Sequence, residues 1–311
     1  MPRGRCAAPT LPRPFPVSCL LSLLSRRSSL LALLLGALAI SVGCGARPGV
    51  PRPPTVPLQS ATLDQLVANF NRSANAVQTM TLKLDLTAKV GKKSYPRVSA
   101  FLLTQKPSSI RIWGTFTLLG RLFDMASDGT HFELSLPTRG QFIVGENNVV
   151  PPTAASPLAK LRPQVILNAL LINPIPPTQH VALDPDTDPS EYEVLVLQPG
   201  HDGVEHLQRR IFFSRLDLLP HRQVIYDGDQ VHETRAAYSH FTRSGQVPVP
   251  QDVTIQRPVE GYSLRLQITS KGITLNKPFP APHTFDLQPP AGTTIIKISD
   301  AARHSPAIGP R

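Results

Sequence analysis

Cysteine is scarce in this chain. The three cysteines are Cys6, Cys19 and Cys44, and none follows position 44. A disulfide framework, a thiolate nucleophile and a cysteine-bound metal are therefore excluded for the rest of the chain. Aromatic residues make up only 6% of the sequence, and no basic stripe is interleaved with them. The formal net charge is +11, and five of the arginines that contribute to it lie before position 28. The rest of the chain is therefore only modestly basic, and we expect no nucleic-acid partner.

Motifs for catalysis and metal binding are also missing. The sequence contains no nucleophile elbow, no phosphate-binding loop and no paired-carboxylate motif. His232 and His240 are eight positions apart on one expected strand, about 26 Å along it, and cannot share an ion. The aspartates of residues 184–188 resemble the start of a calcium loop without its glycine and distal glutamate. We predict no enzyme activity, no metal and no cofactor.

An apolar run is present at residues 31–44, with the sequence LALLLGALAISVGC. Arg26 and Arg27 precede it, and Gly43 stands directly before Cys44. A basic region, an apolar core and a small residue at the cleavage site define an export signal. The core is shorter than the roughly 20 residues that span a bilayer as a helix. We therefore predict export from the cytoplasm.

The end of this run resembles a bacterial lipoprotein signal, in which the cysteine is acylated and becomes the first mature residue. Val42 and Gly43 match that pattern, whereas Ser41 stands where leucine is usual. The resemblance implies a signal peptide at residues 1–43 and lipidation of Cys44. Gly45 replaces the aspartate that retains lipoproteins at the inner membrane, which favours the outer membrane. A secretory signal without lipid and an N-terminal membrane anchor are the alternatives.

The rest of the chain divides into three parts. Residues 44–59 are rich in proline and lack periodicity, which predicts a stiff, extended tether. Residues 60–298 are long enough for a single domain with its own core. Residues 299–311 are expected to form a disordered tail.

Hydrophobic periodicity predicts the secondary structure of this domain. Apolar residues at helical spacing over 63–77 follow Thr62 and Gln65, which form a capping box. A second helix, apolar around most of its circumference, is expected at 162–172. Alternating patterns and hairpin signals such as Asp128-Gly129 indicate strands elsewhere. The expected strands are 79–88, 95–104, 109–116, 118–126, 130–136, 140–144, 191–198, 206–214, 221–226, 231–241, 252–256 and 261–269.

This order predicts a mainly β fold with helices (α+β). We expect an antiparallel half-open β-barrel of about 11 strands, with helices covering its concave apolar face. An apolar cavity between sheet and helices is the natural ligand site. The residues expected to line it are Leu82, Leu84, Leu86, Ile110, Ile112, Phe123 and Met125. Those expected to form a helical lid are Leu167, Leu170 and Leu171.

Several segments resemble the LolA/LolB-like superfamily of periplasmic lipoprotein carriers, outer-membrane lipoprotein receptors and related lipid-binding proteins. They are LDQLVANFNRSANAVQTMTLKLDLTAKV, QKPSSIRIWG, TLLGRLFDMASDGTHFELSLP, residues 140–145 and FDLQPPAG. The resemblance covers roughly residues 60–292 and implies the same half-barrel. The receptor member has an exposed apolar loop between early strands, where this chain has the basic turn at 90–94.

The function expected from these observations is lipid binding. The chain would bind lipid or lipoprotein acyl chains in its cavity, as a monomer anchored to the outer membrane through Cys44. It would face the periplasm, with a periplasmic carrier protein as a partner, and would act in lipid or lipoprotein transport. The alternative is a structural or envelope-sensing lipoprotein that uses the same fold for protein contacts.

Overall fold

The computed structural model describes residues 56–117, 119–147, 162–200, 203–227, 232–279 and 283–298. The chain divides into two compact units, residues 1–55 and 56–311, and every described residue belongs to the second. The predicted signal peptide, Cys44, most of the tether and the tail lie outside the described residues. Lipidation therefore remains a prediction.

Helix α2 (Leu63–Asn75) opens the described part of the chain. The Thr62 hydroxyl accepts a hydrogen bond from the Gln65 backbone N–H at 3.3 Å, and the Gln65 side chain accepts one from the Thr62 N–H at 3.0 Å. These reciprocal bonds satisfy two backbone donors that have no partner inside the helix. The predicted capping box is thus confirmed. Leu66, Phe70 and Ala74 form the buried face of the helix.

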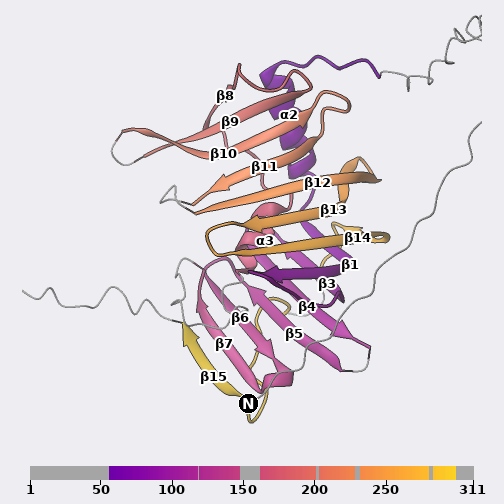
Figure 1. Cartoon of the computed structure of the whole chain (residues 1–311), viewed down its shortest axis with the longest axis vertical. Coiled ribbons are helices and arrows are strands. Elements are labelled where there is room, and N and C mark those ends of the chain that lie inside the picture. Colours follow the sequence, from indigo (N-terminus) through magenta and orange to yellow (C-terminus); the bar gives the residue numbers. More distant parts are fainter. Residues whose placement is uncertain are drawn as a thin grey trace, which may run out of the picture. The chain divides into compact units, whose positions relative to one another are not determined.

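In the described part of the chain, fifteen strands form one sheet, which is antiparallel except where β15 pairs with β7. Its order is β15-β7-β6-β5-β4-β3-β1-β14-β13-β12-β11-β10-β9-β8, and β2 pairs with β1. The sheet is open, with β15 and β8 at opposite ends (Figure 1). The strands are β1 (Thr79–Val90), β2 (Lys93–Ser94), β3 (Val98–Gln105), β4 (Ser109–Phe116), β5 (Gly120–Ser127), β6 (His131–Leu136), β7 (Gln141–Glu146), β8 (His180–Leu183), β9 (Glu191–Pro199), β10 (Glu205–Ser214), β11 (Pro220–Tyr226), β12 (Glu233–Ser244), β13 (Val247–Arg257), β14 (Tyr262–Leu275) and β15 (Thr294–Ile298).

One face of the sheet is apolar along almost its whole width. The register aligns one row of buried side chains from β1 to β7: Leu82, Leu102, Ile112, Met125, Leu134 and Ile143. A second row runs from β1 to β9: Ala88, Leu264, Ile255, Ala236, Gln223, Ile211 and Val194. Because successive side chains alternate between faces, these rows define one inner face. Gln223 is the only polar residue in the two rows.

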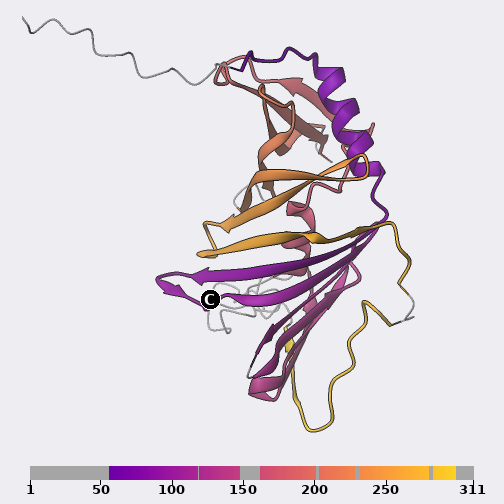
Figure 2. The same cartoon turned by 90° about the vertical axis from the view of Figure 1, so that its right-hand side faces the viewer.

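The two α-helices of the described ranges pack on this inner face, but over different strands. In α2, Leu66 and Phe70 join a buried cluster with residues of β9 and β10. In α3 (Pro163–Ala169), Ile166 and Leu167 belong to the main core, together with residues of β1, β3, β4 and β5. Figure 2 shows α2 running alongside the β8–β11 end of the sheet. Among the described residues, the α-helix at the β3–β7 end is the seven-residue α3, which contacts β4 and β5.

The structure corrects the predicted strand count and the second helix. The sheet has fifteen strands rather than about 11, and it does not close. The additional strands include β2 and β8, of two and four residues, which are too short to show an alternating pattern. The predicted helix at 162–172 is α3, of seven residues. It ends early because Leu170 has extended backbone angles.

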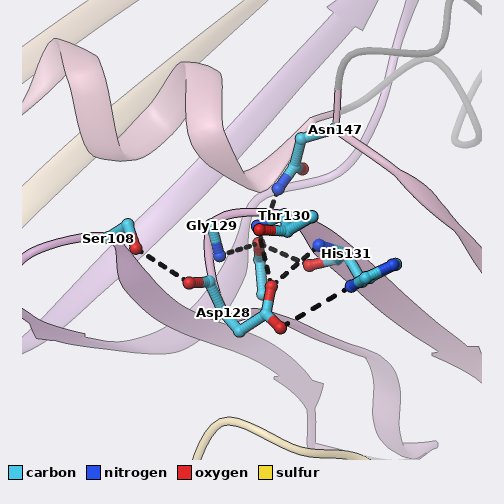
Figure 3. Close-up of polar contacts among 7 residues, drawn as sticks. Ser108, Asp128, Gly129, Thr130, His131 and Asn147 are labelled. Atoms are coloured by element: carbon cyan, nitrogen blue, oxygen red, sulfur yellow. Dashed lines mark hydrogen bonds and ion pairs between the residues drawn. The ribbon is translucent and has the colours of Figure 1, made fainter.

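A tight turn joins β5 to β6 at the predicted Asp128-Gly129 hairpin. The Asp128 carboxylate accepts hydrogen bonds from the Thr130 and His131 backbone N–H groups, both at 2.7 Å. The Ser127 hydroxyl donates to the His131 carbonyl and accepts from Asn147 Nδ2 at 2.8 Å (Figure 3). These contacts satisfy the turn backbone locally, as Asx turns do. They fix the register of β5 against β6, on which part of the cavity wall depends.

The C-terminal segment covers part of the opposite, outer face. Leu287 is buried against Ala126 and Phe142. The Arg111 guanidinium donates to the Thr284 carbonyl at 3.0 Å. After residue 293 the chain continues into β15, which is parallel to β7. The segment around Leu287 is therefore a strap across the outer face of β4–β7, leading into an edge strand.

Candidate functional site

An apolar cavity lies on the inner face where α2 does not reach. Its volume is about 340 Å³, and its walls come from β1, β3, β4, β5, β6, β14, α3 and the connections between them. The lining residues are Leu86, Ala88, Tyr95, Pro96, Val98, Ile112, Phe116, Leu119, Leu122, Phe123, Met125, Leu134, Leu136, Thr138, Arg139, Ile166 and Leu264. Only one of them is charged, Arg139. A pocket of this volume and lining is typical of a small-molecule site.

The β4–β5 hairpin shapes one wall of the cavity. Gly114 lies opposite Phe123, with a register shift directly after it. A Cβ atom at position 114 would lie 2.3 Å from Phe123 Cε1. Glycine is therefore needed at this position for the Phe123 ring to lie over the strand in its present place. Phe116 and Leu119, near the hairpin turn, are 38% and 64% exposed and extend the apolar lining into solvent.

An ion-pair network on the outer face holds the same hairpin. The Arg111 guanidinium donates to both carboxylate oxygens of Asp124, at 3.0 and 2.8 Å. Arg121 also pairs with Asp124, which is 3% exposed. The bidentate geometry links β4 to β5, because the fork of the guanidinium matches the carboxylate. Trp113 lies on this outer face, stacked on Phe101 with ring centroids 5.3 Å apart, and does not line the cavity.

Two buried contacts position α3 beside the cavity. The Tyr238 hydroxyl donates to the Ala169 carbonyl at 2.7 Å, and Gln223 donates to the Tyr238 hydroxyl. Burial raises the pKa of Tyr238 far above its usual value, so the hydroxyl keeps its proton. At the other end, the Arg162 guanidinium lies 4.8 Å from the centre of the Phe132 ring. Its burial lowers the pKa of Arg162 to about 10.

Four of the predicted cavity residues line this volume: Leu86, Ile112, Phe123 and Met125. Leu84 and Ile110 are 1% and 0% exposed and belong to the packed core. Leu82 lines a smaller cavity of about 80 Å³ between the helices and the sheet. The structure thus brings the central residues of the predicted set together and places the others beside them.

The predicted lid residues do not line the larger cavity. Leu167 is buried in the core, and Leu170 and Leu171 line the smaller cavity. The α3 residue at the larger cavity is Ile166. Sequence reasoning also missed Leu122, Leu134 and Leu136. The alternation of apolar residues on β6 could have indicated the last two.

The other sequence-derived candidates lie outside the cavity. Asp184 and Asp188 accept hydrogen bonds from the backbone N–H groups of Asp186 and Ser190, at 3.0 and 2.8 Å, which is turn geometry. His240 pairs with Asp252 on an exposed part of the sheet. Within the described ranges, no group of three or more histidine, cysteine, aspartate or glutamate residues could hold a metal ion. None of the helices described is long and apolar enough to cross a membrane.

No protein-family model matches the sequence, and no curated protein matches it. Solved structures do resemble the fold. A LolA superfamily protein from Nitrosomonas europaea is 10% identical, covers 71% of this chain and 96% of its own, and has a TM-score of 0.46. A DUF1329 family protein from Desulfovibrio piger is 10% identical, and the match covers 71% of this chain and 94% of that protein with a TM-score of 0.46. A domain from Vibrio parahaemolyticus, described as an outer membrane lipoprotein-sorting protein domain, is 7% identical. That match covers 71% of this chain and 94% of the domain, with a TM-score of 0.46.

Proposed function

We propose that this protein binds lipid, or the acyl chains of lipoproteins, in the apolar cavity and performs no chemical step on them. The observation that carries the proposal is the cavity itself, with a volume of about 340 Å³ and an almost wholly apolar lining. An apolar face left open to this extent in a folded protein marks a site for an apolar ligand.

The expected affinity follows from the apolar area of an acyl chain that binding would remove from contact with water. Each buried methylene contributes about 0.8 kcal/mol, so ten of them contribute roughly 8 kcal/mol before the cost of association. That cost is smaller where the pocket is already formed. The Arg111–Asp124 pair and the β5–β6 turn hold the wall strands in place without a ligand, which supports binding to a preformed site.

The membrane part of the proposal rests on the sequence. Acylation at Cys44 and the proline-rich residues 44–59 would hold the cavity within reach of the outer membrane on its periplasmic side. In that position the protein would act as a monomer that receives lipid or lipoprotein from a periplasmic carrier protein. Mass spectrometry of the intact protein released from membranes would show a diacylglyceryl group on Cys44, and an unmodified or uncleaved Cys44 would contradict this part.

A matched pair of substitutions on β1 tests the cavity. Ala88 lines it, whereas the neighbouring Thr87 pairs with Arg265 and points to the outer face. Ala88→Phe should fill the cavity and lower the affinity for a fluorescent fatty acid at least about tenfold, since several methylenes lose their contacts. Thr87→Phe adds the same ring outside and should leave the affinity near that of the parent.

Equal affinities for the parent and both variants, or no acyl ligand in native mass spectra of the parent, would contradict the proposal. The second candidate is a structural or envelope-sensing role through protein contacts. The observation that favours it is the exposed edge strand β15, where Ile295 and Ile296 are 53% and 36% exposed. Deleting these two side chains would then abolish a pull-down partner while leaving fatty-acid binding intact.

A further inference from the structure

Among the described residues that line the cavity, one carries a positive charge and none carries a carboxylate. Arg139 is exposed and is the single charged residue among those that line it, and Tyr95 and Thr138 supply the hydroxyl groups. We propose that the cavity selects amphiphiles with an anionic oxyacid headgroup, a carboxylate or a phosphate, and that Arg139 binds this headgroup. The inference rests on the proposed function and names the chemical class of its ligand.

The backbone fixes the position of Arg139. It ends the 3-10 turn η1 (Pro137–Arg139) between β6 and β7. Gly140 follows with φ of 59°, and its N–H donates to the Pro137 carbonyl at 3.1 Å. The Gly140 carbonyl accepts from the Thr294 N–H at 2.8 Å, so β15 holds the corner from the other side. The base of the arginine is thus anchored while its side chain reaches the opening.

A second basic segment lies at the same opening. The Lys93 ammonium lies 5.1 Å from the centre of the Tyr95 ring, and Tyr95 lines the cavity. Lys92 precedes it in the turn between β1 and β2. The Gly91 N–H donates to the Gly261 carbonyl at 2.7 Å, which ties this turn to the β13–β14 turn. Two separate connections therefore place positive charge near the cavity opening.

The chemistry of the walls dictates which end of an amphiphile enters. A charged or strongly polar headgroup would lose its hydration among leucine, isoleucine and phenylalanine side chains, at a large cost. It must remain at the opening, beside Tyr95, Thr138 and Arg139. A guanidinium forms paired, charge-assisted hydrogen bonds with carboxylate or phosphate oxygens. A hydroxyl oxygen is neutral and accepts a single, weaker hydrogen bond from the guanidinium, and a trimethylammonium group accepts none.

The test compares ligands that share an acyl chain and differ in the headgroup. The full chain carrying Cys44→Ala, delipidated, would be titrated with tetradecanoic acid and with tetradecanol by displacement of a fluorescent fatty acid. A second arm compares a lysophospholipid with a glycerol headgroup and one with a choline headgroup, which separates a net anionic phosphate from a zwitterionic one. We expect the acid to bind about tenfold more tightly than the alcohol, as a charge-assisted hydrogen bond predicts.

Substitutions assign the effect to a residue. Arg139→Gln should lower the affinity for the acid to that for the alcohol, and Arg139→Lys should restore part of the difference. Arg243→Gln, an exposed arginine on β12 that does not line the cavity, should leave the ratio unchanged. Equal binding of acid and alcohol would overturn this inference and leave acyl binding intact. A ratio that survives Arg139→Gln would overturn the role of Arg139. Binding of neither ligand would refute the proposed function itself.

Discussion

Two ends of one apolar face are used differently in this protein. At the β9–β10 end, α2 fills the face with Leu66 and Phe70, and what remains beside them is a cavity of only about 80 Å³. At the β4–β6 end the face has similar residues on its strands, but only the seven-residue helix α3 packs on it in the described ranges, and a cavity of about 340 Å³ remains. Strand composition alone does not distinguish core from ligand site here. What decides is where the covering helix lies.

The largest effect should come from removing a side chain at the packed end. The Phe70 ring is 5% exposed and lies edge-on to Phe213, with ring centroids 6.2 Å apart. Phe70→Ala should lower the free energy of unfolding by about 3–5 kcal/mol, since the buried site cannot collapse fully. Phe123→Ala, at the cavity end, should cost only about 1 kcal/mol, because one side of that ring already faces empty space. Urea denaturation followed by circular dichroism measures both values.

The comparison also has a built-in control. Phe123→Ala should enlarge the cavity and change the preferred acyl-chain length, whereas Phe70→Ala should leave that preference unchanged in the folded fraction. Equal losses of stability at the two positions would mean that the cavity end is packed as tightly as the α2 end. In that case the distinction between core and ligand site would fail.

The sequence allowed part of this arrangement to be predicted, for physical reasons. Helix α2 was predictable because its apolar spacing and the Thr62–Gln65 capping box are local signals. The inner face was predictable because alternation on each strand decides which side is buried. Strand β15 was not, because all but the last of its residues are exposed and its pairing with β7 is parallel and distant in sequence.

Which residues line the cavity was harder to predict than which residues form the inner face of the sheet. Leu84 and Leu86 alternate identically on β1, yet of the two only Leu86 lines the cavity, whereas Leu84 is 1% exposed in the packed core. Arg139 lies in a turn, and its place at the opening depends on how η1 is held by β7 and β15. Such relations join residues far apart in the chain, and no periodic pattern encodes them.

A smaller, pH-dependent effect is expected on the outer side of the cavity end. Burial, and the nearby carboxylates of Asp286 and Asp128, raise the pKa of Glu133 to about 7, while the Leu287 N–H and His131 lower it. The folded protein therefore binds more protons than the unfolded chain between pH 4.5 and about 7. Stability should fall as the pH rises through that range. Glu133 is half-buried, so solvent screening limits the loss to about 1–2 kcal/mol.

Glu133→Gln should remove this pH dependence. The variant should be more stable than the parent by about 1–2 kcal/mol at pH 8, and the difference should vanish below about pH 4.5, where the parent carboxyl is protonated in both states. Glu146→Gln, at the exposed end of β7, is the matched control and should follow the parent. If the free energy of unfolding of Glu133→Gln ran parallel to that of the parent from pH 4 to 8, ionisation of Glu133 would not destabilise the fold, and this prediction would be wrong.

The smallest stability effect, and the sharpest test of the empty volume, should come from Gly114→Ala. The new methyl group would occupy a position 2.3 Å from Phe123 Cε1, so the ring must turn away. In a close-packed core such a clash costs about 1–3 kcal/mol. Here the ring borders the cavity and can move into it, so we expect a loss near 1 kcal/mol and a weaker affinity for long acyl chains. A loss of about 3 kcal/mol with unchanged affinity would show that Phe123 cannot enter the cavity, and that the comparison between a filled and an open end of the face does not hold at this strand.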